Sequence, residues 1–257
     1  MSFFIRYEFF YEKQYAYLRN TGTNVALVEL VDELCKSVDS QDVVTGVFLD
    51  LSKAFDAIPH HVLIHKLQSY GIRGNQLKLM ESYLSNRRQF VSLDGVNSEI
   101  KAVNLGVPQG SVLGPLLFVI FINEIGDLDL FGEVYLYADD TSITYAANDV
   151  SINIHHANLD MQTLVRFFCM NGLTVNISKT YCVHFRPRQR VLISPEPILL
   201  FDHAIQVKNS TKFLRVHVDQ HLIWKTQLDH LTSVLSRTAG IMYKLRRILP
   251  EYTKTQI

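Results

Sequence analysis

The sequence has few cysteines and no pattern that would pair them. Its three cysteines, Cys35, Cys169 and Cys182, are widely spaced and form no CxxC pair. A disulfide framework and a zinc knuckle both need paired or closely spaced cysteines, so we predict neither. The pattern indicates a reducing compartment.

Long apolar runs are also missing. The longest apolar stretch, residues 112–122, is interrupted by Gly114 and Pro115, and it is shorter than the ~20 residues that a membrane-spanning helix needs. The aromatic N-terminal segment, residues 1–17, carries four charged side chains and so lacks the continuous apolar core of a signal peptide. We therefore expect a soluble protein that is not secreted and has no membrane partner.

The formal net charge is zero, but the charges are unevenly distributed along the 257 residues. Counting Lys and Arg against Asp and Glu, the balance is −2 for residues 1–100, −7 for residues 101–164 and +9 for residues 165–257. Clustered carboxylates followed by a basic stretch are typical of metal-dependent enzymes that act on nucleic acids. An ordinary surface with scattered charge is the alternative interpretation.

Hydrophobic periodicity predicts a mixture of helices and strands, and therefore an α+β fold. The pair Asp94-Gly95 predicts a type I′ hairpin turn. A second hairpin is predicted over residues 133–145, with two acidic residues at its tip. Helices are expected over residues 25–38, twice within 59–83, over 154–169 and over 228–249, and strands over residues 43–51, 173–175, 181–185 and 213–218.

Three acidic residues stand at the ends of these predicted strands. Asp50 follows an apolar strand, and Asp139 and Asp140 lie at the hairpin tip. Singly, such acids are usually solvated or turn-forming. Together they suit nucleotidyl transfer, in which two Mg²⁺ ions ~3.5–4 Å apart activate a hydroxyl and stabilise the leaving pyrophosphate. Mg²⁺ prefers carboxylate oxygens, and a bound cation relieves their mutual repulsion.

Three blocks of sequence resemble, in the same order, the catalytic motifs of reverse transcriptases from non-LTR (LINE-like, jockey-type) retrotransposons. They are FLDLSKAFD at residues 48–56, GVPQGSVLGP at residues 106–115 and YADD at residues 137–140. The resemblance implies a right-hand polymerase palm, with an antiparallel sheet backed by helices, fingers elements and a truncated thumb. It also implies an RNA-directed DNA polymerase that adds dNTPs to a DNA primer on an RNA template, with two Mg²⁺ or Mn²⁺ ions.

The resemblance assigns roles to residues of the first and third blocks. Asp50, Asp139 and Asp140 become the catalytic metal ligands. Phe55 falls at the steric gate, where a bulky ring under the sugar excludes a 2′-OH. Without the motif around it, Phe55 would be interpreted as a residue of the hydrophobic core. The resemblance also implies that Leu51 and Ser52 would lie beside the incoming nucleotide.

Further residues are assigned to the nucleotide site in the same way. Gln109 and Gly110 would contact the incoming nucleotide in a loop stiffened by Pro108. Lys179, in a segment that resembles the fourth motif, would protonate the leaving pyrophosphate. Arg19, in a segment that resembles the fingers motif, would meet the nucleotide phosphates.

The chain departs from the family pattern at four positions. Ala16-Tyr17 stands where the family has Gly-Phe, and Gly22 stands where it has a basic residue. Arg215 replaces the glycine of the primer-grip motif. If that glycine allows close backbone approach, the arginine should obstruct the grip.

We expect one reverse transcriptase domain over residues 1–257. Fingers are assigned to residues 1–45 and 60–105, the palm to 46–59 and 106–220, and the start of a thumb to 221–257. As the family's proteins are longer, the chain is expected to be a truncated element or a fragment, in an intracellular, cytoplasmic and nuclear ribonucleoprotein. The sequence leaves the oligomeric state open.

Three other interpretations remain open. The chain could be a catalytically inactive or co-opted remnant of such an element that at most binds nucleic acid. It could instead resemble a group II intron maturase, although no basic maturase-like extension is present. A binding module without catalysis would bind nucleic acid independently of Mg²⁺.

Overall fold

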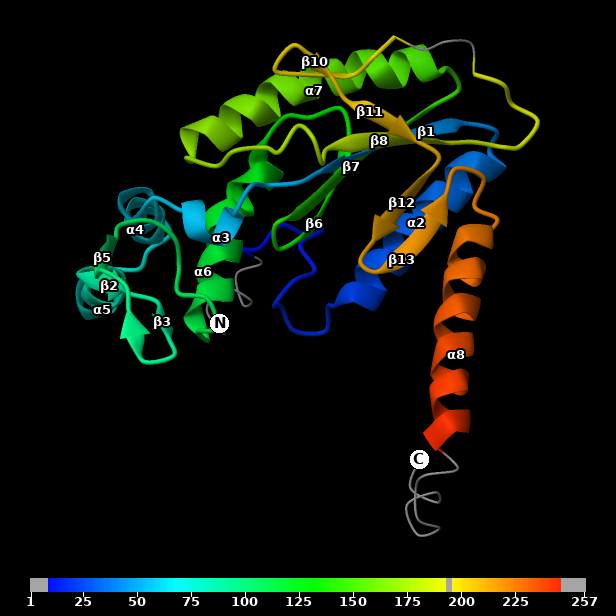
Figure 1. Ribbon diagram of the computed structural model, residues 1–257. Coiled ribbons are helices and arrows are strands. Elements are labelled where there is room, and N and C mark those ends of the chain that lie inside the picture. The colour runs from blue at the N-terminus through cyan, green and yellow to red at the C-terminus, as the bar shows by residue number, and fades with distance from the viewer. Residues whose placement is uncertain (1–8, 193–195, 246–257) are drawn as a thin grey trace.

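A five-stranded sheet forms the centre of the computed structural model, which describes residues 9–192 and 196–245 (Figure 1). The strand order is β11-β8-β1-β7-β6. Neighbouring strands are antiparallel except β11, which runs parallel to β8. The predicted antiparallel sheet is therefore confirmed for four strands and departs from the prediction only at this edge. The strands are β1 (Val43–Leu49), β6 (Glu133–Tyr137), β7 (Asp140–Ala147), β8 (Tyr181–Phe185) and β11 (Gln206–Lys208).

Helices and short hairpins surround this sheet. The helices are α2 (Thr23–Asp39), α3 (Ala54–Ala57), α4 (His60–Ser69), α5 (Gly74–Leu84), α6 (Leu113–Ile122), the 3₁₀ helix η1 (Asn123–Asp127), α7 (Val150–Met170) and α8 (Lys225–Leu245). The short strands are β2 (Arg87–Gln89), β3 (Ser92–Leu93), β4 (Val96–Asn97), β5 (Lys101–Val103), β9 (Leu199–Leu200), β10 (His203–Ala204), β12 (Ser210–Phe213) and β13 (Val216–Asp219).

Strand β1 is buried along its whole length because helices cover both faces of the sheet. Val47 and Leu49 point into the hydrophobic cluster that includes α6 and α7, whereas Val44 and Phe48 point into a second cluster with α2. A strand enclosed on both faces is apolar throughout rather than alternating. This explains the uninterrupted run that leads to Asp50.

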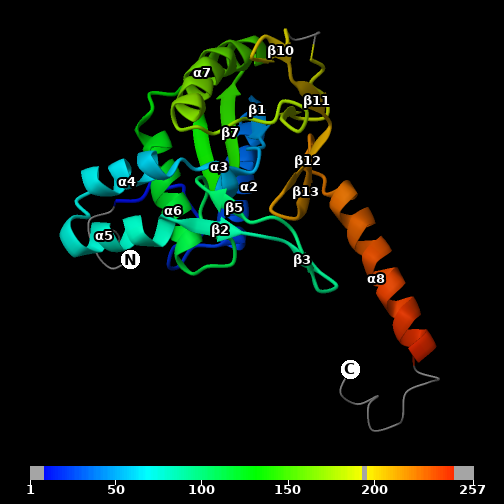
Figure 2. The same ribbon diagram turned by 60° about the vertical axis from the view of Figure 1, so that its left-hand side comes forward.

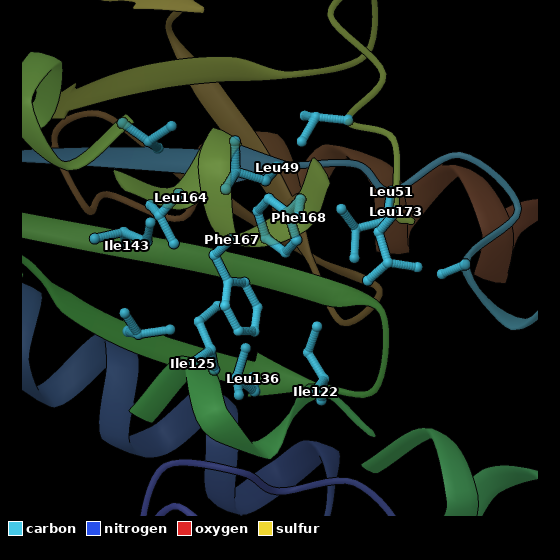
Figure 3. Packing of buried hydrophobic residues seen from close by; sticks show 14 of the residues in the cluster. Leu49, Leu51, Ile122, Ile125, Leu136, Ile143, Leu164, Phe167, Phe168 and Leu173 are labelled. Atoms are coloured by element: carbon cyan, nitrogen blue, oxygen red, sulfur yellow. The ribbon is translucent and has the colours of Figure 1, made fainter. Parts of the chain in front are cut away.

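Helix α7 carries much of the larger cluster. Its N-terminus is capped by the Asp149 carboxylate, which accepts from the Ser151 backbone N–H at 2.9 Å. Its C-terminus closes at Gly172, whose φ of 69° suits the left-handed cap. Figure 3 shows Phe167 and Phe168 of this helix among aliphatic side chains from the sheet and from α6–η1. Truncating such a buried ring to alanine typically costs about 3–5 kcal/mol.

The predicted helices are confirmed, and the two predicted hairpins form. Asp94 and Gly95 have φ values of 50° and 81°, as the type I′ turn between β3 and β4 requires. The predicted strand over residues 213–218 is wrong, because the segment is a hairpin of β12 and β13 with Leu214 and Arg215 at its turn. The predicted strand over residues 173–175 is reduced to an isolated bridge between Val175 and Leu51.

Helix α8 extends away from the sheet (Figures 1 and 2), and none of its described residues is buried. The prediction of a helix over residues 228–249 is confirmed as far as residue 245. Arg246 and Arg247, which we expected on this helix, lie outside the described residues. Within residues 9–192 and 196–245, no helix combines the length and apolarity needed to cross a membrane.

Candidate active site

The three predicted catalytic acids meet at one end of two neighbouring strands. In the antiparallel pair of β1 and β7, Leu49 lies opposite Thr141. Asp50 directly follows β1 and Asp140 begins β7, so both acids lie at the same edge of the sheet. Asp139 occupies the turn before β7.

Burial and mutual repulsion disfavour the charged form of two of these carboxyls. Burial raises the pKa of Asp139, and the neighbouring Asp50 raises it further. The pKa of Asp140 is raised by partial burial and by the charges of Asp139 and Asp50. Together the acids create a negative potential that a cation would relieve.

The turn that carries Asp139 is strained. Tyr137 pairs with Asp140, so the turn consists of Ala138 and Asp139 alone. Ala138 has a φ of 57°, and it is the first central residue of the turn, where type II′ hairpins normally have glycine. Strain of this kind persists only where the surroundings enforce it.

The backbone of Asp50 is fixed by the loop before β8. The Asn176 N–H donates to the Asp50 carbonyl at 2.7 Å, and the Ser52 N–H donates to the Thr174 carbonyl at 2.8 Å. Lys179, from the same loop, places its Nζ 3.7 Å from Asp50 Oδ2, with the two side chains 67% and 39% exposed. An exposed pair of this kind contributes little to stability, so the lysine is free to engage an anion.

A cavity of about 200 Å³ lies at this end of the sheet. Asp50, Asp140 and Lys179 line its polar side. Tyr181 and Phe48, whose rings stack 5.5 Å apart, line its aromatic side. The β12–β13 hairpin closes it through residues 212–214. Sequence reasoning missed Tyr181 and Lys212, which no motif pattern singles out.

The second motif is joined to the first by backbone hydrogen bonds. The Val107 N–H donates to the Phe55 carbonyl and the Gly106 N–H to the Ile58 carbonyl, both at 2.8 Å. A Cβ on Gly106 would lie 2.6 Å from the Cα of Asp56, so only glycine allows this approach.

Phe55 and Gln109 lie on this joined surface. The Phe55 ring is half-buried and stacks on Phe118 with a centroid distance of 4.4 Å, so it has a core contact as well as an accessible part. Gln109 Nε2 donates to Asp56 Oδ1 at 2.9 Å. Gly110 has a φ of 75°, which suits a sharp turn at this point.

The structure does not bring every assigned residue to the acidic cavity. Arg19 is exposed and lines a separate cavity with Leu18 and Phe10. Gln109, Phe55 and Asp139 do not line the cavity of Asp50 and Asp140, although Asp139 precedes Asp140 directly in the turn. Leu51 and Ser52 continue from Asp50 toward α3, whereas Pro108 lies in the loop before α6.

The donor set suits Mg²⁺, although the protein alone does not enclose an ion. Among the described residues, no three His, Cys, Asp or Glu side chains lie close enough to hold a metal together. Mg²⁺ is usually bound through one or two carboxylates, with water and substrate phosphates completing the shell. Asp50, Asp139 and Asp140 supply such oxygens where the ends of β1 and β7 create a negative potential.

Several proteins of known sequence are similar in sequence to much of this chain. Over 96% of the chain it is 27% identical to the probable RNA-directed DNA polymerase from transposon X-element of Drosophila melanogaster, and it spans 27% of that protein. Over 51% of the chain it is 34% identical to the RNA-directed DNA polymerase from mobile element jockey of the same species, of which it spans 15%. The chain is therefore a minor part of the length of these relatives.

A solved structure and a family model agree with this result. Apo telomerase from Candida tropicalis, truncated from its C-terminal domain, superposes with a TM-score of 0.51 at 12% identity over 74% of this chain and 38% of its own. The likeness confirms the predicted right-hand polymerase fold. Residues 6–218 match the model of the reverse transcriptase (RNA-dependent DNA polymerase) family. The chain thus belongs to the reverse transcriptase family, and its relatives include the polymerases of non-LTR retrotransposons.

Proposed function

We propose that this chain is the catalytic part of an RNA-directed DNA polymerase that extends a DNA primer on an RNA template. The observation that carries the proposal is the meeting of Asp50, Asp139 and Asp140 at one edge of the sheet, where burial and repulsion raise the pKa of the latter two. Bound there, two Mg²⁺ ions would activate the primer hydroxyl and stabilise the leaving pyrophosphate.

The chain's own residues position the substrates. Asp50 and Asp140 face a cavity whose stacked rings, Phe48 and Tyr181, offer an apolar wall. Lys179 Nζ stands 3.7 Å from Asp50 and can donate a proton to the pyrophosphate oxygen as it leaves. In this proposal, the exposed part of the Phe55 ring excludes a 2′-OH.

The loop of the second motif completes the nucleotide site in this proposal. Gln109 contacts α3 through Asp56, and Pro108 and Gly110 flank it in the same loop. Leu51 and Ser52 bridge β1 and α3, with the Ser52 N–H held by a backbone bond.

We further propose how the chain divides into palm, fingers and thumb, and in which compartments the protein acts. Residues 46–59 and 106–220 form the palm, residues 1–45 and 60–105 the fingers, and residues 221–257 the start of a thumb. The exposed basic helix α8 would then follow the primer–template duplex. The proposed partners are an RNA template, a DNA primer and dNTPs. With these partners, the protein would act in a cytoplasmic and nuclear ribonucleoprotein.

Primer extension tests the proposal. The purified chain should add dNTPs to a DNA primer on an RNA template when Mg²⁺ or Mn²⁺ is present, and it should not when EDTA is added. Asp139→Asn keeps the size of the side chain but removes its charge, so it should abolish extension. Asp149→Asn, at the cap of α7, is the matched control and should leave extension intact.

A nucleic-acid-binding remnant of the same descent is the second candidate. Arg215 favours it, because a non-glycine residue sits at a φ of 76° in the hairpin that closes the cavity. Primer–template binding that is unaffected by EDTA and by Asp139→Asn, with no extension under any condition, would establish this candidate instead.

A further inference from the structure

We propose that Gln14 is a positioning residue that holds the strained turn of Asp139 in place and couples it to the N-terminal loop. The inference rests on the proposed polymerase function for its kinetic consequence, but not for its structural one. It concerns a side chain that the motif pattern left without a role.

The backbone around Gln14 extends the sheet next to the acidic turn. The Tyr15 N–H donates to the Leu136 carbonyl, and the Leu136 N–H donates to the Lys13 carbonyl, both at 2.9 Å. Residues 13–15 thereby form a parallel bridge to the outer edge of β6, the strand that leads into the turn.

The Gln14 side chain is buried beneath this turn, with 1% of its surface exposed. Its Oε1 accepts from the Ala16 N–H at 2.8 Å and from the Ala138 N–H at 3.5 Å. Both partners are N–H groups, so the amide orientation is determined by its hydrogen bonds. One oxygen therefore joins the N-terminal segment to the first residue of the catalytic turn.

The other end of the amide shows that Gln14 is not there for stability alone. Its Nε2 is buried and has no hydrogen-bond partner among the described residues. An unmet buried donor is destabilising, whereas an apolar side chain of similar length would avoid the loss. The benefit of glutamine at this position lies in its oxygen.

That oxygen acts on a backbone that needs support. Ala138 has a φ of 57° at a position that usually has glycine, and it is 4% exposed. A hydrogen bond to its N–H restrains the peptide next to Asp139. A displacement of 1 Å at a reacting group can lower a rate by about 10²-fold.

The same contact links the turn to the exposed loop that carries Tyr17. Tyr17, two residues after the bridge, has a φ of 59° and is 51% exposed. Burial raises the pKa of its phenol, and the nearby Tyr137 and Asp139 raise it further, so Tyr17 lies close to the acidic turn. Gln14 holds the start of this loop through the Ala16 N–H.

Gln14→Met tests the assignment because it keeps the length of the side chain and removes the acceptor. Amide hydrogen exchange of Ala138, followed by NMR on protein with isotopically labelled alanine, should accelerate about fivefold, as expected for the loss of one hydrogen bond. In single-nucleotide extension, kcat should fall about tenfold with little change in KM for the dNTP. The melting temperature should also fall, because the buried N–H groups of Ala16 and Ala138 lose their acceptor.

Two further variants serve as controls. Gln14→Glu retains an acceptor oxygen. Because burial and the neighbouring acids keep the new carboxyl protonated, this variant should keep the Ala138 amide protected, even if Gln14→Met does not fold. Tyr15→Phe, in the same segment, loses a hydrogen bond to Glu29 on the opposite side and should leave Ala138 exchange and kcat unchanged.

An unprotected Ala138 amide in the wild type, or exchange that is unchanged in Gln14→Met, would overturn the assignment. So would loss of protection in Gln14→Glu. If the wild type does not extend primers, the proposed function fails, but hydrogen exchange still decides whether Gln14 holds the turn.

Discussion

Arg215→Gly should make the protein more stable, because Arg215 occupies a turn position that favours glycine. Leu214 and Arg215 have φ values of 45° and 76°, and both lie between the paired residues Phe213 and Val216. A two-residue type I′ turn requires this geometry and is usually formed by Asn-Gly or Gly-Gly. The glycine that the resemblance led us to expect at this position would suit this backbone conformation.

The magnitude follows from two opposing terms. A non-glycine residue in the left-handed region costs about 1–2 kcal/mol, and glycine loses about 0.5–1 kcal/mol more conformational entropy on folding. Arg215→Gly should therefore raise the free energy of unfolding by about 0.5–1 kcal/mol, taking the difference between these ranges. For a chain of this size, each kcal/mol raises the melting temperature by about 2–4 °C.

Urea denaturation with a matched variant separates conformation from charge. Arg215→Ala removes the guanidinium but keeps the Cβ, so it should change the unfolding free energy by less than about 0.5 kcal/mol, as at most exposed sites. A stabilisation by Arg215→Ala equal to that by Arg215→Gly would show that charge, rather than φ, is responsible. A loss of stability in Arg215→Gly would refute the reasoning.

Three further predictions concern the site and helix α8. Asp140→Asn should raise the melting temperature at pH 7 without Mg²⁺, because the fold raises the pKa of Asp140 and therefore disfavours its charged form. This gain in melting temperature should vanish as the pH falls through the raised pKa toward 3.8. In a thermal melt, Mg²⁺ should stabilise the wild type more than the variant. Phe55→Val should allow ribonucleotides to be incorporated in primer extension. Unchanged discrimination between the two sugars would show that Phe55 serves only as a core residue packed on Phe118. Replacing Arg237 and Lys244 on α8 by Gln should flatten the log–log dependence of nucleic-acid affinity on salt by roughly 0.7–0.9 per lost phosphate contact; an unchanged slope would place the nucleic acid elsewhere.

Local chemistry explains which hairpins the sequence predicts. Asp94-Gly95 predicts its turn correctly because both residues tolerate positive φ. Leu214-Arg215 makes a turn of the same kind without a turn-forming residue, so the pattern over residues 213–218 is that of a continuous strand. The two-residue turn is recognisable only from the pairing of β12 with β13.

The site was predictable only as far as its motifs extend. Asp50, Asp139 and Asp140 were identified from three short blocks, and the structure places them at one sheet edge. Gln14 begins the segment that resembles the fingers motif, but the sequence assigned it no role, since its partner Ala138 lies 124 positions away in the chain. A buried amide is informative only when the group that it contacts is known.

The position of the acids depends on the register of β1 and β7, and the core determines that register. Side chains alternate between the two faces of a strand, so a slip of one residue would exchange the residues that face α7 with those that face α2. Val47 and Leu49 fill one cluster and Phe48 the other, and neither cluster would accept the exchange without loss of packing. The same apolar contacts that stabilise the sheet therefore bring Asp50 beside Asp140, where mutual repulsion would otherwise separate them.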